Sequence, residues 1–448
     1  MTPSLTDLSQ ALLRAAKSAG ADAADVLVVR GTSVGIGVRD GRLEEAERAE
    51  GIDLGLRVLM GQRQACVSAS DSAPDTMAAM AERAVAMARE APEDPTIGLA
   101  DPGQLSDRRD ARGLDLADDG EEPDPAALQQ AALACEAAAR DIPGISQIDQ
   151  CSAGYSRREM VMAATNGFSG GYTRTGHSLS CVAITGTGTG MERDYFGDMR
   201  LHRADLLPPE EIGRTAAERA LARAGARQPR TGRFPVLYDE RVAASLIGHL
   251  LSAINGTAIA RGASWLRDGL DTPVLPVGID LVEDPHRPRI SGSRPFDAEG
   301  LPTARRALVE GGTLTGWVLD LATGRKLDLP STANATRSAA SPPSPATGNV
   351  TLTQGPRSRE ALMAEMGTGL LVTSLIGATI NSTTGDYSRG ASGLWVENGQ
   401  PAFAVNECTI AGNLRDMLRA IVPANDARPH LSRVVPSLLV EGMTLAGA

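Results

Sequence analysis

The hydrophobic pattern at the start of the chain predicts a helix followed by an antiparallel sheet. Leucines recur at helical spacing after Ser4, and this pattern stops at Gly20. Apolar and polar residues then alternate along the chain, and glycines interrupt the alternation as turn signals. We expect four short strands, over residues 25–30, 33–39, 42–49 and 51–60, with turns at Gly31, Gly41 and Gly61.

A second block with the same order of elements follows. The capping pattern Ser72-x-x-Asp75 predicts a helix that closes the first block. Residues 92–124 are acidic and proline-rich with little apolar periodicity, which predicts a solvated linker or a long surface loop. An alanine-rich helix over 125–140 then leads into strands that flank an Asn166-Gly167 hairpin turn.

The remainder of the chain has the composition of a β-rich domain. After a short strand and a helix over 240–254, turn residues recur at intervals of about ten residues. We therefore predict an α+β protein, with an antiparallel sheet and flanking helices in the N-terminal region and a mostly β C-terminal domain. The expected domains are residues 1–227, divided into blocks 1–91 and 125–227 around the linker 92–124, and residues 228–448. The proline-containing segment 332–348 is expected to be flexible and to run over the surface.

Charge and composition exclude several classes of protein. The 44 Lys and Arg residues against 55 Asp and Glu residues give a net charge of −11, which opposes a nucleic-acid surface. The longest apolar run, residues 370–380, is far shorter than the roughly 20 residues of a membrane span. Five cysteines without a C-x-x-C pair indicate a reducing cytoplasm and give no zinc-ribbon signal. We expect a cytoplasmic protein that binds neither nucleic acid nor a membrane.

Two motifs with possible chemistry have simpler structural explanations. The glycine-rich run Gly186-Thr-Gly-Thr-Gly190 lacks the spacing of a phosphate-binding loop, so a hairpin tip is expected. Asp297 and Glu299 form an alternating carboxylate pair that could serve acid/base work or bind a cation. Gly300 and Pro302 follow this pair, which favours a turn-stabilising role.

The densest polar stretch runs from Asn381 to Gly393, directly after the apolar strand 370–380. It contains Asp386, Ser388 and Arg389 among three glycines, and arginine can make forked bonds to a carboxylate or to peptide carbonyls. An Asp386–Arg389 salt bridge that stabilises a turn is an equally good interpretation of the same residues.

This stretch also carries a family resemblance. The sequence Gly385-Asp-Tyr-Ser-Arg-Gly-Ala-Ser-Gly393, and the run from Val405 to Leu414, resemble the signature of the TldD/PmbA family, also called modulator of DNA gyrase. The likeness extends along nearly the whole chain and includes Pro295-Phe-Asp-Ala-Glu-Gly-Leu-Pro302. It implies a cytoplasmic metallopeptidase built as a heterodimer of two related subunits.

The resemblance also implies which subunit type this chain is. The TldD type carries H-E-x-x-x-H on a helix early in the C-terminal domain, where this chain has Ala244-Ser-Leu-Ile-Gly-His249. Only His249 matches, while Ala244 and Ser245 replace the first ligand and the catalytic glutamate, and neither binds zinc strongly or acts as a base near neutral pH. We therefore expect a PmbA/TldE-type subunit with no metal and no catalytic residue of its own, and with zinc in the partner.

The expected partners are thus a TldD-type zinc-bearing subunit and a peptide substrate, with a possible homodimer when the chain is alone. In this hypothesis Asp386, Ser388, Arg389, Asp297 and Glu299 are candidates for ordering a loop or touching substrate, and exposed strand edges of the β domain pair with the peptide backbone. Two other functions stay open. One is a hydrolase with its own unrecognised site, and the other is a regulatory binding protein that acts without proteolysis.

Overall fold

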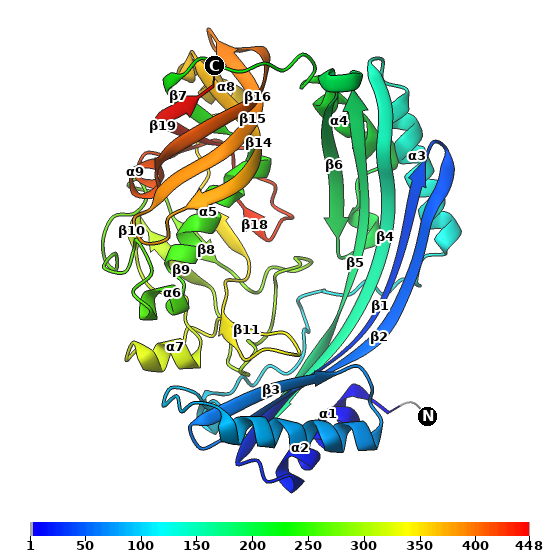
Figure 1. Ribbon diagram of the computed structural model, residues 1–448, viewed down its shortest axis with the longest axis vertical. Helices are drawn as coiled ribbons and strands as arrows, with labels where there is room; N and C mark the ends of the chain where they lie inside the picture. The colour runs from blue at the N-terminus through cyan, green and yellow to red at the C-terminus, as the bar shows by residue number, and fades with distance from the viewer. Residues whose placement is uncertain (1–2, 448) are drawn as a thin grey trace.

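The computed structural model describes residues 3–447 and divides into a sheet-and-helix half and a barrel-containing half (Figure 1). The predicted α+β class is confirmed. The N-terminal half contains α1 Leu5–Ser18, β1 Ala23–Arg39, β2 Arg42–Met60, β3 Arg63–Ala69, α2 Pro74–Glu90, α3 Pro125–Arg140, β4 Ile145–Ala164, β5 Ser169–Thr185, β6 Glu192–Arg200 and α4 Pro209–Leu221.

One six-stranded sheet, in the order β3-β2-β1-β4-β5-β6, spans both predicted N-terminal blocks. All of its pairings are antiparallel. The prediction of four short strands in the first block is wrong, because the expected turn at Gly31 does not form and no new strand begins at Gly51. The two glycines face each other across the ladder between β1 and β2, which both continue through them as long strands. The hairpin tips at Asn166-Gly167 and at residues 186–190 are confirmed.

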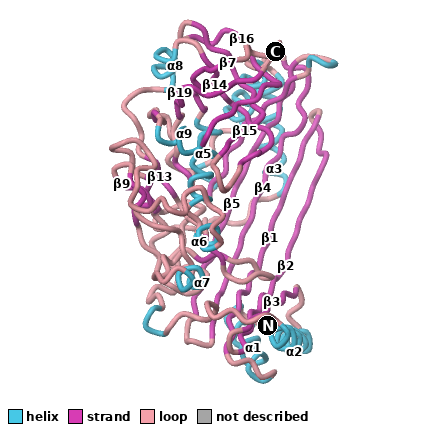
Figure 2. The backbone as a smooth tube through the Cα atoms, turned by 60° about the vertical axis from the view of Figure 1, so that its left-hand side comes forward, coloured by secondary structure: helices cyan, strands magenta, loops and turns pink. Residues whose placement is uncertain are grey.

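The two faces of this sheet have different roles. Even-numbered residues of β1, such as Val26 and Val34, are buried against the helices, Val26 under α1 and α2 and Val34 under α3 and α4. Because side chains alternate along a strand, the odd-numbered Leu27 and Val29 point the other way, and they line a cavity shared with the C-terminal half. The sheet therefore packs helices on one face and presents the other to the rest of the molecule (Figures 1 and 2).

The C-terminal half is built around a sheet that closes on itself. Its order is β16-β15-β14-β7-β19-β17, and β16 also pairs with β19. A second sheet has the order β10-β9-β8-β13-β18. The strands are β7 Gly232–Tyr238, β8 Leu281–Glu283, β9 Arg306–Glu310, β10 Thr313–Leu314, β11 Ala335–Thr336, β12 Ser344–Pro345, β13 Val350–Leu352, β14 Gly369–Ile380, β15 Asp386–Glu397, β16 Gln400–Asn413, β17 Val422–Pro423, β18 Arg433–Val434 and β19 Leu438–Ala446. The helices are α5 Glu240–Ala253, α6 Gly256–Ala260, α7 Leu321–Lys326, α8 Arg359–Met366 and α9 Leu414–Arg419.

Closure of this sheet changes the expectation about peptide pairing. The long strands β14, β15 and β16 are each hydrogen-bonded on both sides, at least over part of their length. In the N-terminal sheet, by contrast, β2 pairs with β3 only from Leu54 to Met60, so its first half has a partner on one side alone. The longest open edge is thus on the N-terminal sheet and not in the β domain.

Two irregular segments join the halves and are more ordered than the sequence predicts. Segment 92–124 has no strand, yet Leu114 and Leu116 are buried, and Arg325 of α7 donates hydrogen bonds to the carbonyls of Thr96 and Leu99. The segment is therefore packed rather than solvated throughout. Segment 332–348 runs partly over the surface, as expected, but it contains β11 and β12 and is anchored by the buried Arg337 side chain.

No helix in residues 3–447 combines the length and the apolar character that a membrane crossing requires.

Candidate functional site

Helix α5 carries the Ala244-Ser245-His249 positions and is fixed by its N-cap and its apolar face. The Asp239 side chain accepts a hydrogen bond from the Arg241 backbone N–H at 3.3 Å. Residues on one side of α5, including Leu246 and Leu250, are fully buried in the C-terminal core. This packing leaves the opposite side of the helix, with Arg241 and Ser245, facing a cavity.

Each of the three motif positions has a contact that the structure defines. Ala244 is half-buried and packs against the core. The Ser245 hydroxyl donates to the Val242 carbonyl at 2.7 Å, so it is engaged with its own helix. The His249 ring packs edge-on against Tyr387 of β15, with 5.8 Å between ring centroids, and its Nε2 is buried without a hydrogen-bond partner.

The surroundings of His249 keep its imidazole neutral. Burial lowers the pKa of His249, and the positive charge of Arg389 lowers it further. The Tyr387 hydroxyl is turned toward the buried Tyr238 hydroxyl at 3.4 Å. His249 thus lies in an aromatic, cation-flanked setting between α5 and β15.

The structure separates the polar residues of β15. Side chains alternate along the strand, so Tyr387 and Arg389 lie on the face toward α5, whereas Asp386 and Ser388 lie on the other face. Asp386 accepts hydrogen bonds from the Thr384 hydroxyl at 2.6 Å and from the Asn413 amide at 3.1 Å. These bonds lower the pKa of Asp386.

Arg389 donates from Nε to the Gly377 carbonyl at 2.7 Å. Gly377 lies at an irregularity of the β14–β15 ladder and has a φ of 66°, a conformation that favours glycine. No Asp386–Arg389 salt bridge forms within the described part of the chain. Arg389 therefore orders β14 instead of pairing with Asp386.

Ser245 and Arg389 meet at a cavity of about 640 Å³ between the two halves of the molecule. The N-terminal half contributes Asp194 and Tyr195 of β6, and the Asp194 carboxylate pairs with Arg241 of α5 at 3.0 Å. Helix α5 and strand β15 thus form two parts of one site, which the N-terminal sheet completes.

Asp297 and Glu299 lie elsewhere and are both buried. Asp297 accepts hydrogen bonds from the backbone N–H groups of Glu299 and Leu301, each at 2.9 Å, and from that of Ala335 at 3.0 Å. Glu299 accepts from the first backbone N–H of α7, that of Leu321, at 2.9 Å. In this structure the pair braces a turn and a helix start, and it is not exposed to the Arg389 cavity.

Comparison with known proteins identifies the family. Family models match residues 24–88 as PmbA/TldA metallopeptidase domain 1, residues 118–224 as the central domain and residues 231–447 as the C-terminal domain. A metalloprotease PmbA from Escherichia coli O157:H7 is 36% identical over 431 residues, which cover 96% of this chain and 93% of the relative. The chain belongs to the PmbA/TldD metallopeptidase family.

Other family members agree with this assignment. A metalloprotease PmbA homolog from Haemophilus influenzae is 33% identical over 96% of this chain and 94% of its own length. A solved structure described as a candidate modulator of DNA gyrase, from Bacteroides thetaiotaomicron, superposes with a TM-score of 0.91 at 26% identity and covers 99% of both chains. TldE from Thermococcus kodakarensis shares the fold, with a TM-score of 0.85 at 20% identity over 98% of this chain and 100% of that one.

The residues around α5 do not fit the zinc ion that a metallopeptidase family implies. Zinc sites in proteins take Cys, His and carboxylate ligands. Here His249 is the single such donor of the motif, its neighbour Tyr387 presents a ring, and Arg389 adds a positive charge that opposes a cation. We therefore derive no step through a metal on this helix.

The sequence analysis missed a buried group of three thiols. The sulfurs of Cys135 on α3, Cys151 on β4 and Cys181 on β5 lie within 4.8 Å of one another, and Cys151 is directly opposite Cys181 in the strand ladder. All three are fully buried in the core under α3 and α4. Cysteines 16 and 30 residues apart carry no spacing signal, so register and helix packing alone reveal the cluster.

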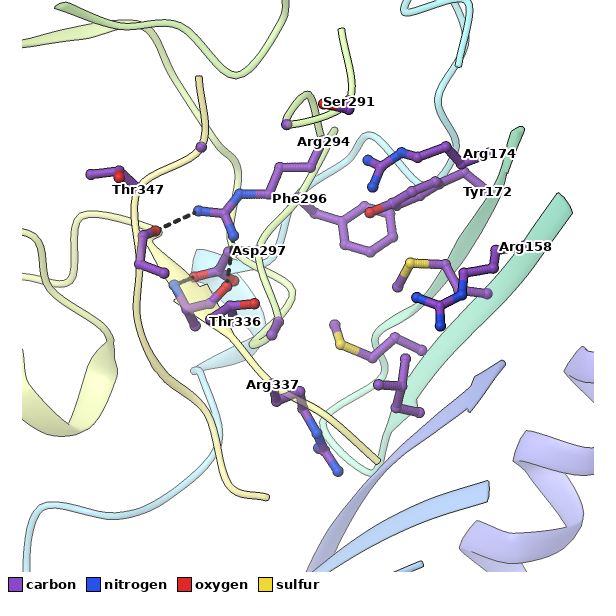
Figure 3. Close-up of a pocket in the computed structure, with 18 of the residues that line it drawn as sticks. Arg158, Tyr172, Arg174, Ser291, Arg294, Phe296, Asp297, Thr336, Arg337 and Thr347 are labelled. Carbon is purple, nitrogen blue, oxygen red and sulfur yellow. Dashed lines mark hydrogen bonds between the residues drawn. The ribbon is translucent and has the colours of Figure 1, made fainter. Parts of the chain in front are cut away.

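The sequence analysis also missed a second cavity, of about 550 Å³, between the open face of the N-terminal sheet and the C-terminal half (Figure 3). Asp297 forms part of its wall, but the other charged side chains that line it are arginines. These arginines are scattered along the sequence without a common motif: Arg158, Arg174, Arg294, Arg337 and Arg433.

Proposed function

We propose that this chain is the metal-free, PmbA/TldE-type subunit of a cytoplasmic two-subunit zinc peptidase. In this proposal a TldD-type partner holds the zinc ion and the catalytic glutamate. The present chain completes the chamber in which an unfolded peptide is cleaved.

The residues at the zinc-motif positions of α5 carry the proposal. Ala244 and Ser245 stand where a zinc-binding histidine and a catalytic glutamate are expected from the family motif, and the Ser245 hydroxyl is already bonded within the helix. Neither side chain can take over those roles. The family relationship supplies the peptidase class, and these substitutions support a non-catalytic role within it.

The Arg389 cavity is the part of this chain that we expect to face the shared chamber. It places Arg389, Arg241 and Ser245 at one opening between the two halves. Arginine can donate hydrogen bonds to the carbonyls of an extended peptide. Arg389 thereby both orders β14 and is available to a substrate backbone.

Co-expression with a subunit that carries H-E-x-x-x-H tests this proposal. We expect a stable heterodimer, about one zinc ion per heterodimer from the partner's site alone, and peptide cleavage that the partner achieves only in the complex. The matched control is a partner in which the glutamate of the motif is replaced by glutamine. That complex should assemble and bind zinc but should not cleave.

Three results would contradict the proposal. Stoichiometric zinc together with peptide cleavage by the isolated chain would make it an independent hydrolase. Assembly without any gain in cleavage would favour a regulatory binding protein. Failure to assemble, with a homodimer as the lasting form, would remove the two-subunit arrangement.

A further inference from the structure

The second cavity has a charge that contrasts with the charge of the whole chain. The protein carries a net charge of −11, yet five arginines and one carboxylate, that of Asp297, are found among the described residues that line this cavity. Figure 3 shows Arg158 and Arg174 on the side of the N-terminal sheet and Arg294 on the opposite side. A local excess of cations in an acidic protein attracts an anionic group to this cavity.

Two of these arginines, Arg174 and Arg294, are held in place by backbone carbonyls and not by acidic side chains. Arg174 donates to the Ser293 carbonyl at 2.7 Å. Arg294 donates to the carbonyls of Ala335 at 3.0 Å and Ala346 at 3.1 Å. Carbonyl partners fix the position of a guanidinium but leave its charge uncompensated.

Several donor groups in this arginine cluster have no partner. Nε of Arg174, Nε of Arg294 and Nη2 of Arg337 are buried without a hydrogen-bond acceptor. The Arg337 side chain is only 1% exposed, and its Nη1 pairs with the Asp25 carboxylate. Buried donors without acceptors are costly, which is the situation that an incoming anion relieves.

The acidic groups nearby are already occupied. Asp297 accepts from three backbone N–H groups, and Asp25 is shared between Arg57 and Arg337. Burial raises the pKa of Glu299 well above the usual carboxyl range, and the negative charges of Asp297 and Asp320 raise it further, so Glu299 adds little negative charge. Among the described ion pairs, Arg337 is the one cavity arginine that pairs with a carboxylate, so an excess of positive charge remains on the wall.

The rest of the wall combines apolar side chains with the hydroxyls of Ser291, Thr336, Thr347 and Ser432. Leu27, Met160 and Met162 come from the open face of the sheet, and Phe296 packs edge-on against Tyr172, with 5.8 Å between their centroids. A ligand for this cavity thus combines an anionic group with apolar or neutral parts, as a peptide end does. The planar fork of arginine matches the two oxygens of a carboxylate.

One residue of the cavity wall, Arg433, lies close to the helix of the proposed peptidase site. Arg433 reaches α5 from this side, because a Cβ added at Gly248 would lie 3.3 Å from its Nη1. Gly248 precedes His249, while Ser245 of the same helix lines the Arg389 cavity. Helix α5 therefore lines the Arg389 cavity and lies close to one arginine of the second cavity.

We propose that this arginine-lined cavity binds a carboxylate of the peptide substrate, either its C-terminal group or an acidic side chain. The inference rests on the proposed function, and it adds that substrates with a free carboxylate are preferred. It concerns binding by this chain itself, so it can be tested without the zinc-bearing partner.

The experiment measures binding of short fluorescent peptides to the isolated full chain by anisotropy. Three versions of one peptide are compared. The first has a free C-terminus, the second is amidated at the C-terminus, and the third is amidated and carries an internal glutamate. We expect the two peptides that carry a carboxylate, or one of them, to bind about tenfold or more tightly than the neutral peptide. The difference should shrink as salt is raised.

Neighbouring residues of β4 provide a matched pair of variants. Arg158 and Arg157 are both exposed, but only Arg158 lines the cavity, because side chains alternate along the strand. Arg158→Gln combined with Arg433→Gln should remove about tenfold of the affinity for the acidic peptide, whereas Arg157→Gln should leave it unchanged. Circular dichroism confirms that each variant is folded.

Two outcomes would overturn the inference. All three peptides bind equally well, or inorganic phosphate binds at this site while no peptide does. Because the readout is peptide binding, a failure here is distinct from a failure of the two-subunit proposal, which is judged by assembly and cleavage with the partner.

Discussion

Arg337 and Asp25, 312 residues apart in the sequence, form a buried ion pair between the C-terminal half and β1 of the N-terminal sheet. The same carboxylate accepts a bond from Nε of Arg57 at 2.7 Å. Both side chains of the Arg337–Asp25 pair are less than a tenth exposed. One carboxylate thus holds two guanidinium groups and ties the two halves together.

Asp25→Asn should strongly destabilise the protein, because it leaves two buried arginines without a counter-charge. We expect the free energy of unfolding to fall by about 3–5 kcal/mol, measured by urea denaturation at neutral pH. Asp110→Asn is the control, since Asp110 pairs with an Arg112 side chain that is 91% exposed. An equally small effect of both substitutions would show that the buried pair does not connect the halves.

The Asp25 pair also predicts an acid limit of stability. Burial alone would raise the pKa of Asp25, but the charges of Arg57 and Arg337 outweigh it and lower the pKa below its usual range. The stabilisation is therefore present above the ordinary carboxyl pKa and is lost as the pH falls through the lowered one. The wild-type protein should lose stability below about pH 4, and Asp25→Asn should show a weaker loss there.

Glu299→Gln should change the pH dependence in the opposite direction. The raised pKa of Glu299 means that its contribution is fully present below the unfolded carboxyl pKa and declines as the pH rises toward the folded value. Glutamine keeps an acceptor for the Leu321 backbone N–H but does not ionise. The stability of the variant relative to wild type should therefore rise between pH 5 and pH 8, measured by urea midpoints. The exposed Glu90→Gln should show no such trend.

Arg389→Ala should loosen the irregular part of β14 and impair the proposed heterodimer. The substitution removes the hydrogen bond to the Gly377 carbonyl, and it removes a side chain from the wall of the Arg389 cavity. We expect faster hydrogen exchange around Gly377 and slower peptide cleavage by the complex. Arg267→Ala, at an exposed arginine, is the control. Unchanged assembly, cleavage and exchange would exclude a role of Arg389 in either the loop or the substrate site.

The five cysteines should differ sharply in reactivity. Cys66 is half-buried, and burial raises its pKa, so it should react slowly with a thiol reagent at pH 7 and faster as the pH rises. The other four are buried, and burial raises the pKa of Cys408 to about 11. Absorbance titration should detect one thiol in the native protein and five in denaturant. Rapid native labelling of Cys135, Cys151 or Cys181 would show that α3 opens.

The polar signature of β15 shows how far local sequence carries the site. The run from Gly385 to Gly393 indicates the family and a functional strand, and the comparisons confirm the family. It does not reveal that Arg389 and Asp386 lie on opposite faces of β15 and bond to different segments. Which partners a polar side chain meets depends on strand register, which residue spacing along one strand does not encode.

The N-terminal sheet shows the opposite limit. Gly31 looks like a turn, and Gly51 like the start of a new strand, when each is considered with its neighbours alone. In the fold they face each other across the ladder between β1 and β2, because long-range pairing outweighs local turn preference. The same long strands then create the open sheet face that becomes one wall of the arginine-lined cavity.

By itself the sequence determined the α+β class, the five longest helices, the family, and the replacement of the zinc motif by Ala244 and Ser245, since these depend on short patterns and residue identities. The predicted Ser72 cap of α2 is wrong, because Ala73 is the N-cap and has no side-chain hydrogen bond. Only the tertiary structure decided which side chains meet: Arg337 with Asp25, His249 with Tyr387, and five scattered arginines around one cavity. Such contacts join residues that are distant in sequence, and their geometry is set by strand register and by the packing of the two halves against each other.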